Sequence, residues 1–151
     1  MLNPRQKAMA IKRSTIFEEL PIEDIARFAE IVQEEDVPEG HMIFQEGEVG
    51  DRMFIIVSGE VLIRRRVDGG GDLKILLGKG ECFGEMAILD GHPRSASVNV
   101  TREGKFLTIG RDEFMEILRV YPEISFKIIR ILSERLRRTP TDMSKTLKEQ
   151  L

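Results

Sequence analysis

The N-terminal part of the chain carries apolar residues at helical spacing. Between positions 16 and 32 they fall on one face of a helix, at Ile22, Ile25, Phe28, Ala29 and Val32. Pro21 precedes them, and proline suits the first turn of a helix because an N–H has no partner there. The pattern predicts a helix within 16–32 that packs one face on the core.

Between positions 37 and 110 the pattern changes to short apolar runs separated by glycine. The runs lie at 42–44, 53–57, 61–67, 73–77 and 106–109, and residues 95–100 alternate between small polar and apolar side chains. Such regular turn spacing is typical of antiparallel strands in a small barrel or jelly roll. Three consecutive glycines at 69–71, between two aspartates, predict a hairpin loop.

After Gly110 the helical spacing returns, first around Phe114 and Ile117 and then in a longer helix from Pro122. The apolar stripe of that helix contains Ile124, Ile128, Ile129, Ile131, Leu132 and Leu136. A stripe this wide predicts that the helix covers both the β-roll and a second surface, for which another copy of the same helix is the simplest partner. The alternative is a core helix in a monomer. Beyond Thr139 and Pro140, a short second helix is predicted through Leu147.

The predicted architecture is therefore one domain, mainly β with flanking helices. We expect an N-terminal helical segment at 1–36, a β-roll at 37–110 and C-terminal helices at 111–151. A chain of 151 residues is long enough to bury roughly 68–70% of its unfolded surface, so its core needs no disulfide.

Composition narrows the function classes. Lys and Arg total 23 against 26 Asp and Glu, giving a net charge of −3, which argues against nonspecific binding to nucleic acid. The single cysteine, Cys82, excludes an intrachain disulfide, and with only His41 and His92 it leaves too few ligands for structural zinc. No apolar run is long enough to span a bilayer. We expect a cytoplasmic protein with no metal site and no membrane contact.

Two further features bear on nucleic acid. The arginines at 64–66 are consecutive on a predicted strand and so point to both faces, which favours solvated surface over a nucleic-acid site. A DNA-binding module with its own core needs roughly sixty residues more, whereas 12 residues follow Thr139. We expect no direct DNA binding by this chain.

The candidate chemistry is concentrated at 83–96. Gly84 follows Phe83 and opens a short run of helix formers, so the backbone N–H groups of Glu85, Met86 and Ala87 are placed to bind an anion at a helix N-terminus. After a loop containing glycine and proline, Arg94 returns to grip a phosphate. Ser95 adds a hydroxyl donor.

Glu85 is the informative residue of this segment, because a carboxylate repels an anion unless the ligand also offers hydroxyl donors. A ribose phosphate offers both groups. The alternative is structural: Glu85 as a first-turn helix residue and Arg94 as its ion-pair partner. No nucleophile has a neighbouring base, so no catalytic residue is predicted.

Segment 83–96 resembles the phosphate-binding cassette of the cyclic nucleotide-binding domain family, the regulatory modules of catabolite activator protein and of cyclic-nucleotide-dependent kinases and channels. The resemblance covers about 17–139, with the glycines at 40, 47, 59, 80 and 84 and the turn at 47–51. It implies an eight-stranded antiparallel β-roll with a long C-terminal helix. It also implies Glu85 on the ribose 2′-hydroxyl, and Arg94 with the amides of Glu85, Met86, Ala87 and Ala96 on the cyclic phosphate.

The resemblance further implies a sensor in which the helix from Pro122 moves on ligand binding, forms a homodimer and signals to a downstream protein. Thr139 falls where the family contributes a threonine to the purine, while Pro140 replaces the serine expected next and removes a backbone donor. The expected ligand is cyclic AMP or cyclic GMP, with no other cofactor. The alternatives are a ligand-free interaction module that keeps the fold and, from another class, a nucleotide hydrolase.

Overall fold

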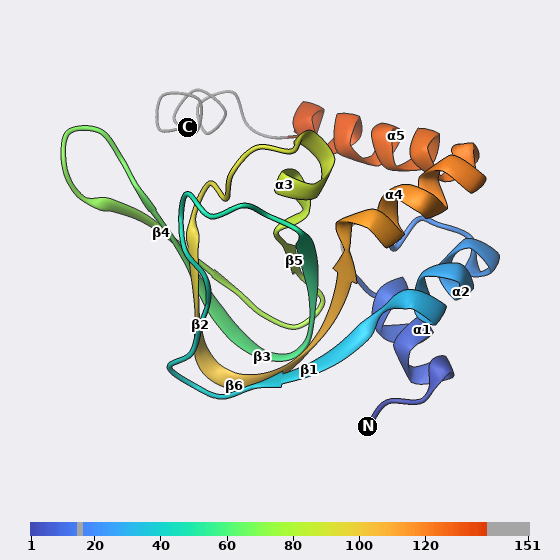
Figure 1. Cartoon of the computed structure of the whole chain (residues 1–151), viewed down its shortest axis with the longest axis horizontal. Coiled ribbons are helices and arrows are strands. Elements are labelled where there is room, and N and C mark those ends of the chain that lie inside the picture. The colour runs from blue at the N-terminus through green and yellow to red at the C-terminus, as the bar shows by residue number, and fades with distance from the viewer. Residues whose placement is uncertain (15–16, 139–151) are drawn as a thin grey trace.

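The computed structural model describes residues 1–14 and 17–138. Within them, six strands form one antiparallel sheet that curls into a roll (Figure 1). The strands are β1 (Gln33–Val37), β2 (Met42–Phe44), β3 (Arg52–Arg66), β4 (Asp72–Leu77), β5 (Cys82–Phe83) and β6 (Ser97–Gly110). The order is β1-β6-β3-β4, with β2 paired to β6 and β5 paired to β3. The predicted mainly β class with antiparallel strands is confirmed.

The strand count differs from the eight that the family resemblance implied. Strands β3 and β6 are 15 and 14 residues long, and each joins two apolar runs that the sequence pattern had separated. They stay paired through register shifts between Ile56 and Val61. At this point Gly59 has φ +93°, and a Cβ on it would lie 2.6 Å from the Cα of Gly104. Glycine therefore lets the two backbones approach closely and bend while the strands continue.

Four helices gather at one end of the roll (Figure 1): α1 (Pro4–Lys12), α2 (Ile22–Ile31), α4 (Arg111–Val120) and α5 (Pro122–Arg138). The short helix α3 (Glu85–Asp90) lies between β5 and β6. None of the helices in the described ranges is long and apolar enough to cross a membrane. The predicted second helix beyond Thr139 lies outside the described residues.

The N-terminal helices differ from the sequence prediction. The helix expected within 16–32 begins at Ile22, and α1 lies in the predicted N-terminal helical segment 1–36, although its bounds were not predicted. Its signal is nevertheless present in the sequence. Pro4 follows Asn3, whose side chain accepts a hydrogen bond from the Gln6 N–H at 2.8 Å, while the Gln6 side chain accepts one from the Asn3 N–H at 2.9 Å. This reciprocal cap defines the start of α1.

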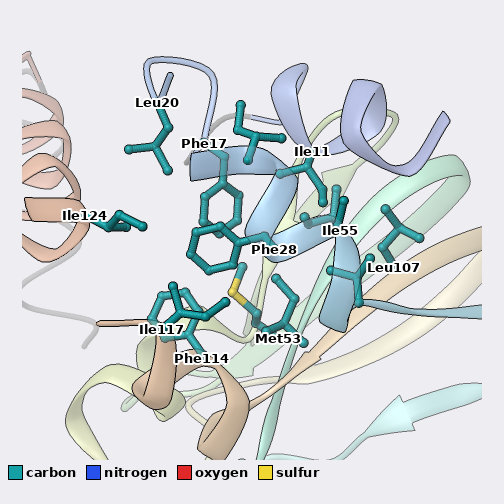
Figure 2. Close-up of a cluster of buried hydrophobic side chains, with 14 of the residues drawn as sticks. Ile11, Phe17, Leu20, Phe28, Met53, Ile55, Leu107, Phe114, Ile117 and Ile124 are labelled. Atoms are coloured by element: carbon teal, nitrogen blue, oxygen red, sulfur yellow. The ribbon is translucent and has the colours of Figure 1, made fainter. Parts of the chain in front are cut away.

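Alternate residues of β3 pack into two separate hydrophobic cores. Met53 and Ile55 face the helices, in a core that also contains Phe28, Phe114 and Ile124 (Figure 2). The residues of the other face pack inside the roll, where the core consists of Phe44, Phe54, Ile56, Val61, Phe83, Val98, Val100 and Phe106. The helical core ties the roll to α5, and the inner core shapes the cavity described below.

Candidate functional site

A cavity of about 650 Å³ opens inside the roll. Its apolar wall comes from the β3–β4 hairpin, through Ile63, Ile75 and Leu77. Phe44 of β2, Arg65 of β3, and Cys82 and Phe83 of β5 also line the cavity. The remaining lining residues follow β5 in the chain and are Gly84, Glu85, Asp90, His92, Pro93, Arg94, Ser95, Ala96 and Val98. An apolar wall facing a small set of convergent polar groups is typical of small-molecule sites.

Arg94 is the central polar group of this cavity. This residue is 5% exposed. Its Nη1 donates to the carbonyl of Gly84 at 3.1 Å, and its Nη2 donates to the carbonyl of Arg52 at 2.6 Å. The guanidinium lies 3.9 Å from the centre of the Phe44 ring. Two carbonyls and an aromatic face thus hold the cation in one orientation.

The charge of Arg94 is incompletely compensated. Its Nε is buried and has no hydrogen-bond partner among the described residues. Burial lowers the pKa of the Arg94 guanidinium, and the carboxylates of Asp51, Glu48 and Glu85 act in the opposite direction. A buried cation with an unsatisfied donor is unfavourable by itself. An anionic ligand in the cavity would supply the missing acceptor.

The turn at 47–51 positions the backbone of Arg94. The Arg94 N–H donates to the carbonyl of Glu48 at 2.7 Å, and the Arg94 carbonyl accepts from the Gly47 N–H at 2.9 Å. Next to it, the Glu46 N–H donates to the hydroxyl of Ser97 at 3.0 Å. Both backbone groups of Arg94 are therefore satisfied by this turn, which leaves its side chain directed by the contacts with Gly84 and Arg52.

The backbone conformation and surroundings of Gly84 strongly favour glycine. Its φ is +84°, and a Cβ would lie 2.7 Å from the Arg94 Nη1 and 3.1 Å from the Arg52 carbonyl oxygen. A side chain would therefore occupy the space of the guanidinium. Helix α3 begins directly afterwards with Glu85, which is half-buried and lines the cavity. Gly84 thus brings the start of α3 and the guanidinium of Arg94 together.

The site combines three kinds of chemistry in one cavity. Arg94 and the start of α3 suit an anion. Glu85, as a carboxylate, suits hydroxyl donors. The hairpin wall suits an apolar, planar group. No group of His, Cys, Asp and Glu able to hold a metal ion occurs in the described part of the chain.

Comparison with known proteins decides the family. The family model described as the cyclic nucleotide-binding domain matches residues 34–121, which is more than half of the chain. The chain belongs to the cyclic nucleotide-binding domain family. The match spans β1 to the end of α4 and therefore includes every lining residue of the cavity.

Relatives of this cyclic nucleotide-binding domain include a regulator and two solved structures. The chain is 38% identical over 135 residues to the CRP-like cAMP-activated global transcriptional regulator of Mycobacterium tuberculosis, covering 89% of this chain and 60% of that protein. The N-terminal domain of a transcriptional regulator from Streptomyces coelicolor superposes with a TM-score of 0.76 at 29% identity, covering 89% of this chain and 94% of that one. The regulatory domain of Toxoplasma gondii PKA with cAMP gives a TM-score of 0.69 at 28% identity, covering 76% of this chain and 44% of that one.

The sequence had identified one side of the cavity in this cyclic nucleotide-binding domain. Of the candidate residues, Phe83, Gly84, Glu85, Arg94, Ser95 and Ala96 line it. Met86 and Ala87 lie in α3. Thr139 lies outside the described residues. The lone loop residue His92 also lines the cavity, and its N–H donates to the Asp90 carboxylate at 2.8 Å.

Other parts of the site were missed. Phe44 looked like an ordinary core residue, and Arg52 contributes a backbone carbonyl that no side-chain pattern reveals. Of the arginines at 64–66, interpreted as solvated surface, Arg64 and Arg66 are exposed, whereas Arg65 is half-buried and lines the cavity. The apolar residue Ile63 indicates the face of Arg65 in the sequence, because residues two apart on a strand lie on the same face of the sheet.

Proposed function

We propose that this cyclic nucleotide-binding domain binds cyclic AMP in the cavity and acts as a regulatory sensor. The observation that carries the proposal is the buried guanidinium of Arg94, with an unpaired Nε, in a cavity that it shares with Glu85. Two relatives support the choice of cyclic AMP as the ligand. The Mycobacterium tuberculosis regulator is cAMP-activated, and the Toxoplasma gondii domain was solved with cAMP.

Each part of the ligand has a proposed partner. The cyclic phosphate is bound by Arg94 and by the backbone amides of Glu85, Met86, Ala87 and Ala96, with the Ser95 hydroxyl as a further donor. The Glu85 carboxylate accepts from the ribose 2′-hydroxyl. Phe83 and Gly84 shape the phosphate end, and Thr139 is proposed for the purine. This division assigns the phosphate and ribose contacts to 37–110. It assigns the purine contact of Thr139 and signalling to the C-terminal segment 111–151, and support of the fold to α1 and α2 in 1–36.

Ligand-induced stabilisation tests the proposal. Cyclic AMP at about 100 times its dissociation constant should stabilise the ligand-free protein by roughly 2.7 kcal/mol, which corresponds to a rise in Tm of roughly 5–10 °C for a chain of this size. Adenosine 5′-monophosphate has the same base and sugar but an acyclic phosphate, and it should give a much smaller shift. The measurement is thermal unfolding of the full chain with each nucleotide.

The other outcomes separate the remaining hypotheses. A larger shift with cyclic GMP than with cyclic AMP would reverse the base assignment. No shift with either, in protein shown to be folded and empty, would favour the ligand-free interaction module. Nucleotide recovered unchanged after incubation with the protein is expected, because binding without turnover is proposed; hydrolysis would indicate an enzyme.

A contiguous set of contacts supports transmission of binding from the cavity to α5. Ile88 of α3 is fully buried in the helical core with Ile124 and Ile128 of α5. Arg111, the first residue of α4, donates through Nε to the Ile88 carbonyl at 3.3 Å. A ligand that shifts α3 would therefore change the packing of α4 and α5. This link is the proposed signalling route.

We also propose that α5 pairs with α5 of a second copy. Ile124 and Ile128 are buried, whereas Phe126 and Ile129 of the same helix are 72% and 59% exposed. Positions three apart lie on one helix face, so these two side chains form an apolar patch that is directed away from the core. Of the apolar stripe predicted from the sequence, Ile124 and Ile128 thus pack within one chain, whereas Ile129 does not.

Replacing both Phe126 and Ile129 with serine is expected to weaken dimerisation at least roughly 10-fold, because apolar side chains at the centre of an interface carry most of its free energy. Light scattering coupled to size-exclusion chromatography would measure the mass as a function of concentration. Val49→Ser, at an exposed apolar side chain in the turn at 47–51, is the matched control. A wild-type protein that stays monomeric, or a variant that dimerises equally well, would overturn this interface.

A further inference from the structure

The hairpin of β3 and β4 has a second face, which points away from the cavity. Residues directly opposite each other on paired strands lie on the same face of the sheet. The face with Ile63 and Ile75 lines the cavity. The opposite face carries three cross-strand pairs, namely Leu62 with Leu76, Arg64 with Lys74, and Arg66 with Asp72. These six residues form the outer hairpin face, on a hairpin that projects from the roll in Figure 1.

Cations dominate the outer hairpin face. Arg64, Arg66 and Lys74 are exposed, and none of them forms an ion pair with another described residue. Arg64 and Lys74 are directly opposite each other, where Cβ atoms lie about 5 Å apart and like charges destabilise the sheet. The whole chain has a net charge of −3, so the charge of this face is opposite in sign to that of the chain. Its cations therefore suit an acidic partner.

Protection of a sheet edge explains only part of this charge. Lysine on an edge strand prevents unwanted strand pairing, and Lys74 lies on β4, which is an edge strand among the described residues. Arg64 lies on β3 and is paired on both sides, with Ser97 of β6 and with Lys74 of β4. An interior position needs no such protection, so the Arg64–Lys74 pair calls for another role.

The edge of β4 adds backbone groups to this face. In the described part of the chain β4 pairs only with β3, so alternate N–H and C=O groups along Asp72–Leu77 point outward from the sheet. A strand added at this edge would place alternate side chains beside those of β4. On the outer hairpin face these neighbours are Lys74 and Leu76, of which Leu76 is 58% exposed. An apolar residue beside Leu76 and an acid two positions away beside Lys74 would match both.

An acidic protein segment matches the outer hairpin face better than nucleic acid does. Nucleic-acid affinity comes mainly from many contacts between cations and phosphates, whereas three cations are present here. Leu76 offers an apolar contact that a phosphate backbone does not use. Asp68 and Asp72 near the hairpin tip carry the same charge as a phosphate. An extended segment with both acidic and apolar side chains uses the cations, the leucine and the free edge together.

We propose that the outer hairpin face is a docking site for an acidic, extended segment of a partner protein, which joins the sheet as a strand beside β4. Main-chain hydrogen bonds to β4 supply affinity, and Arg64, Lys74 and Leu76 select the side chains of the segment. The inference does not rest on the proposed function, because neither Arg64 nor Lys74 is among the described residues that line the cavity.

A nuclear magnetic resonance titration of the isotope-labelled full chain tests the docking site. The probe is a peptide of about eight residues, the length of a strand, with the repeat Thr-Val-Thr-Glu, which presents valine and glutamate on one face. The control peptide has lysine in place of glutamate. We expect the glutamate peptide to shift the amide signals of Asp72–Leu77 more than those of the other strands. The lysine peptide should bind at least roughly 10-fold more weakly, because it repels Arg64 and Lys74.

Charge reversal on the protein gives the matched experiment. The variant R64E/K74E should bind the glutamate peptide at least roughly 10-fold more weakly than wild type and the lysine peptide more tightly, a gain that misfolding does not produce. R5E reverses an exposed charge on α1, which lies at the opposite end of the molecule from the hairpin (Figure 1). It should stay within about twofold of wild type, as expected for a distant, screened charge.

Several results would overturn the docking site. Signals of Asp72–Leu77 that do not move with the glutamate peptide, or that move equally with both peptides, contradict it. Equal affinity of wild type and R64E/K74E for the glutamate peptide does so too. If a single-stranded oligonucleotide moves these signals and the peptide does not, the partner is a nucleic acid and the proposed segment is wrong. R64E/K74E should bind cyclic AMP as wild type does, so the docking site and the proposed function fail separately.

Discussion

Arg94→Ala is expected to reduce the affinity for cyclic AMP by roughly 10- to 150-fold, the equivalent of about 1.5–3 kcal/mol for a charge-assisted hydrogen bond. Arg94 is 5% exposed, and its guanidinium is already oriented by the carbonyls of Gly84 and Arg52. Little conformational entropy is therefore lost when it binds a phosphate, and water screens the interaction only weakly. Titration calorimetry with cyclic AMP would measure the loss.

Two controls isolate the role of Arg94 in binding. Arg102→Ala removes the same charge at an exposed position of β6 outside the cavity lining and should leave affinity nearly unchanged. Arg94→Lys keeps the charge but cannot donate to both carbonyls from a rigid fork, so it should bind more weakly than wild type. If Arg94→Ala binds cyclic AMP as tightly as wild type, Arg94 is not the phosphate ligand.

Phe28→Ala is expected to have the largest effect on stability, destabilising the fold by about 3–5 kcal/mol. Phe28 of α2 is fully buried, and its ring centre lies 4.9 Å from that of Phe17 and 5.7 Å from that of Phe114 on α4. Figure 2 shows it in the middle of the helical core. Its removal leaves a cavity between segments far apart in the sequence, which cannot collapse without moving both helices.

Thermal and urea unfolding would measure this effect. For a chain of this length the expected loss corresponds to a fall in Tm of roughly 6–20 °C. Ile22→Ala is the control on the same helix, because Ile22 is 56% exposed and its truncation should cost no more than about 0.5 kcal/mol. Comparable losses for the two variants would contradict the role given to the aromatic cluster.

An ion pair beside the helical core connects α2 to α5. Asp24 of α2 is buried, and the Lys127 Nζ of α5 lies 2.7 Å from its Oδ2. Arg27 adds a contact at 3.2 Å to Asp24, and its guanidinium lies 3.8 Å from the centre of the Tyr121 ring. These contacts hold the junction of α4 and α5 against α2. Any movement of α5 on ligand binding has to rearrange them.

Much of the fold was predictable because its signals are local. The hairpin glycines at 69–71, the helix from Pro122 and the cassette at 83–96 are each contained in a short window of sequence. Other local signals were present and missed, such as the cap formed by Asn3 and Gln6. Strand β1 was not predicted, because its residues Gln33–Val37 are mostly polar and partly exposed. Its pairing with β6 is a long-range contact that a local pattern does not show.

The sequence by itself determined the family, the mainly β class with flanking helices, and the residue types that suit a ribose phosphate, because motif spacing and apolar periodicity are properties of the chain. Only the tertiary structure decided how the site is completed. The carbonyl of Arg52, the ring of Phe44 and the side chain of Arg65 reach the cavity from strands remote from the cassette. It also decided that β3 and β6 run as continuous strands, because the close approach of Gly59 and Gly104 exists only when both are paired. Contacts between distant segments depend on register and curvature, and these are set by the packing of the whole sheet.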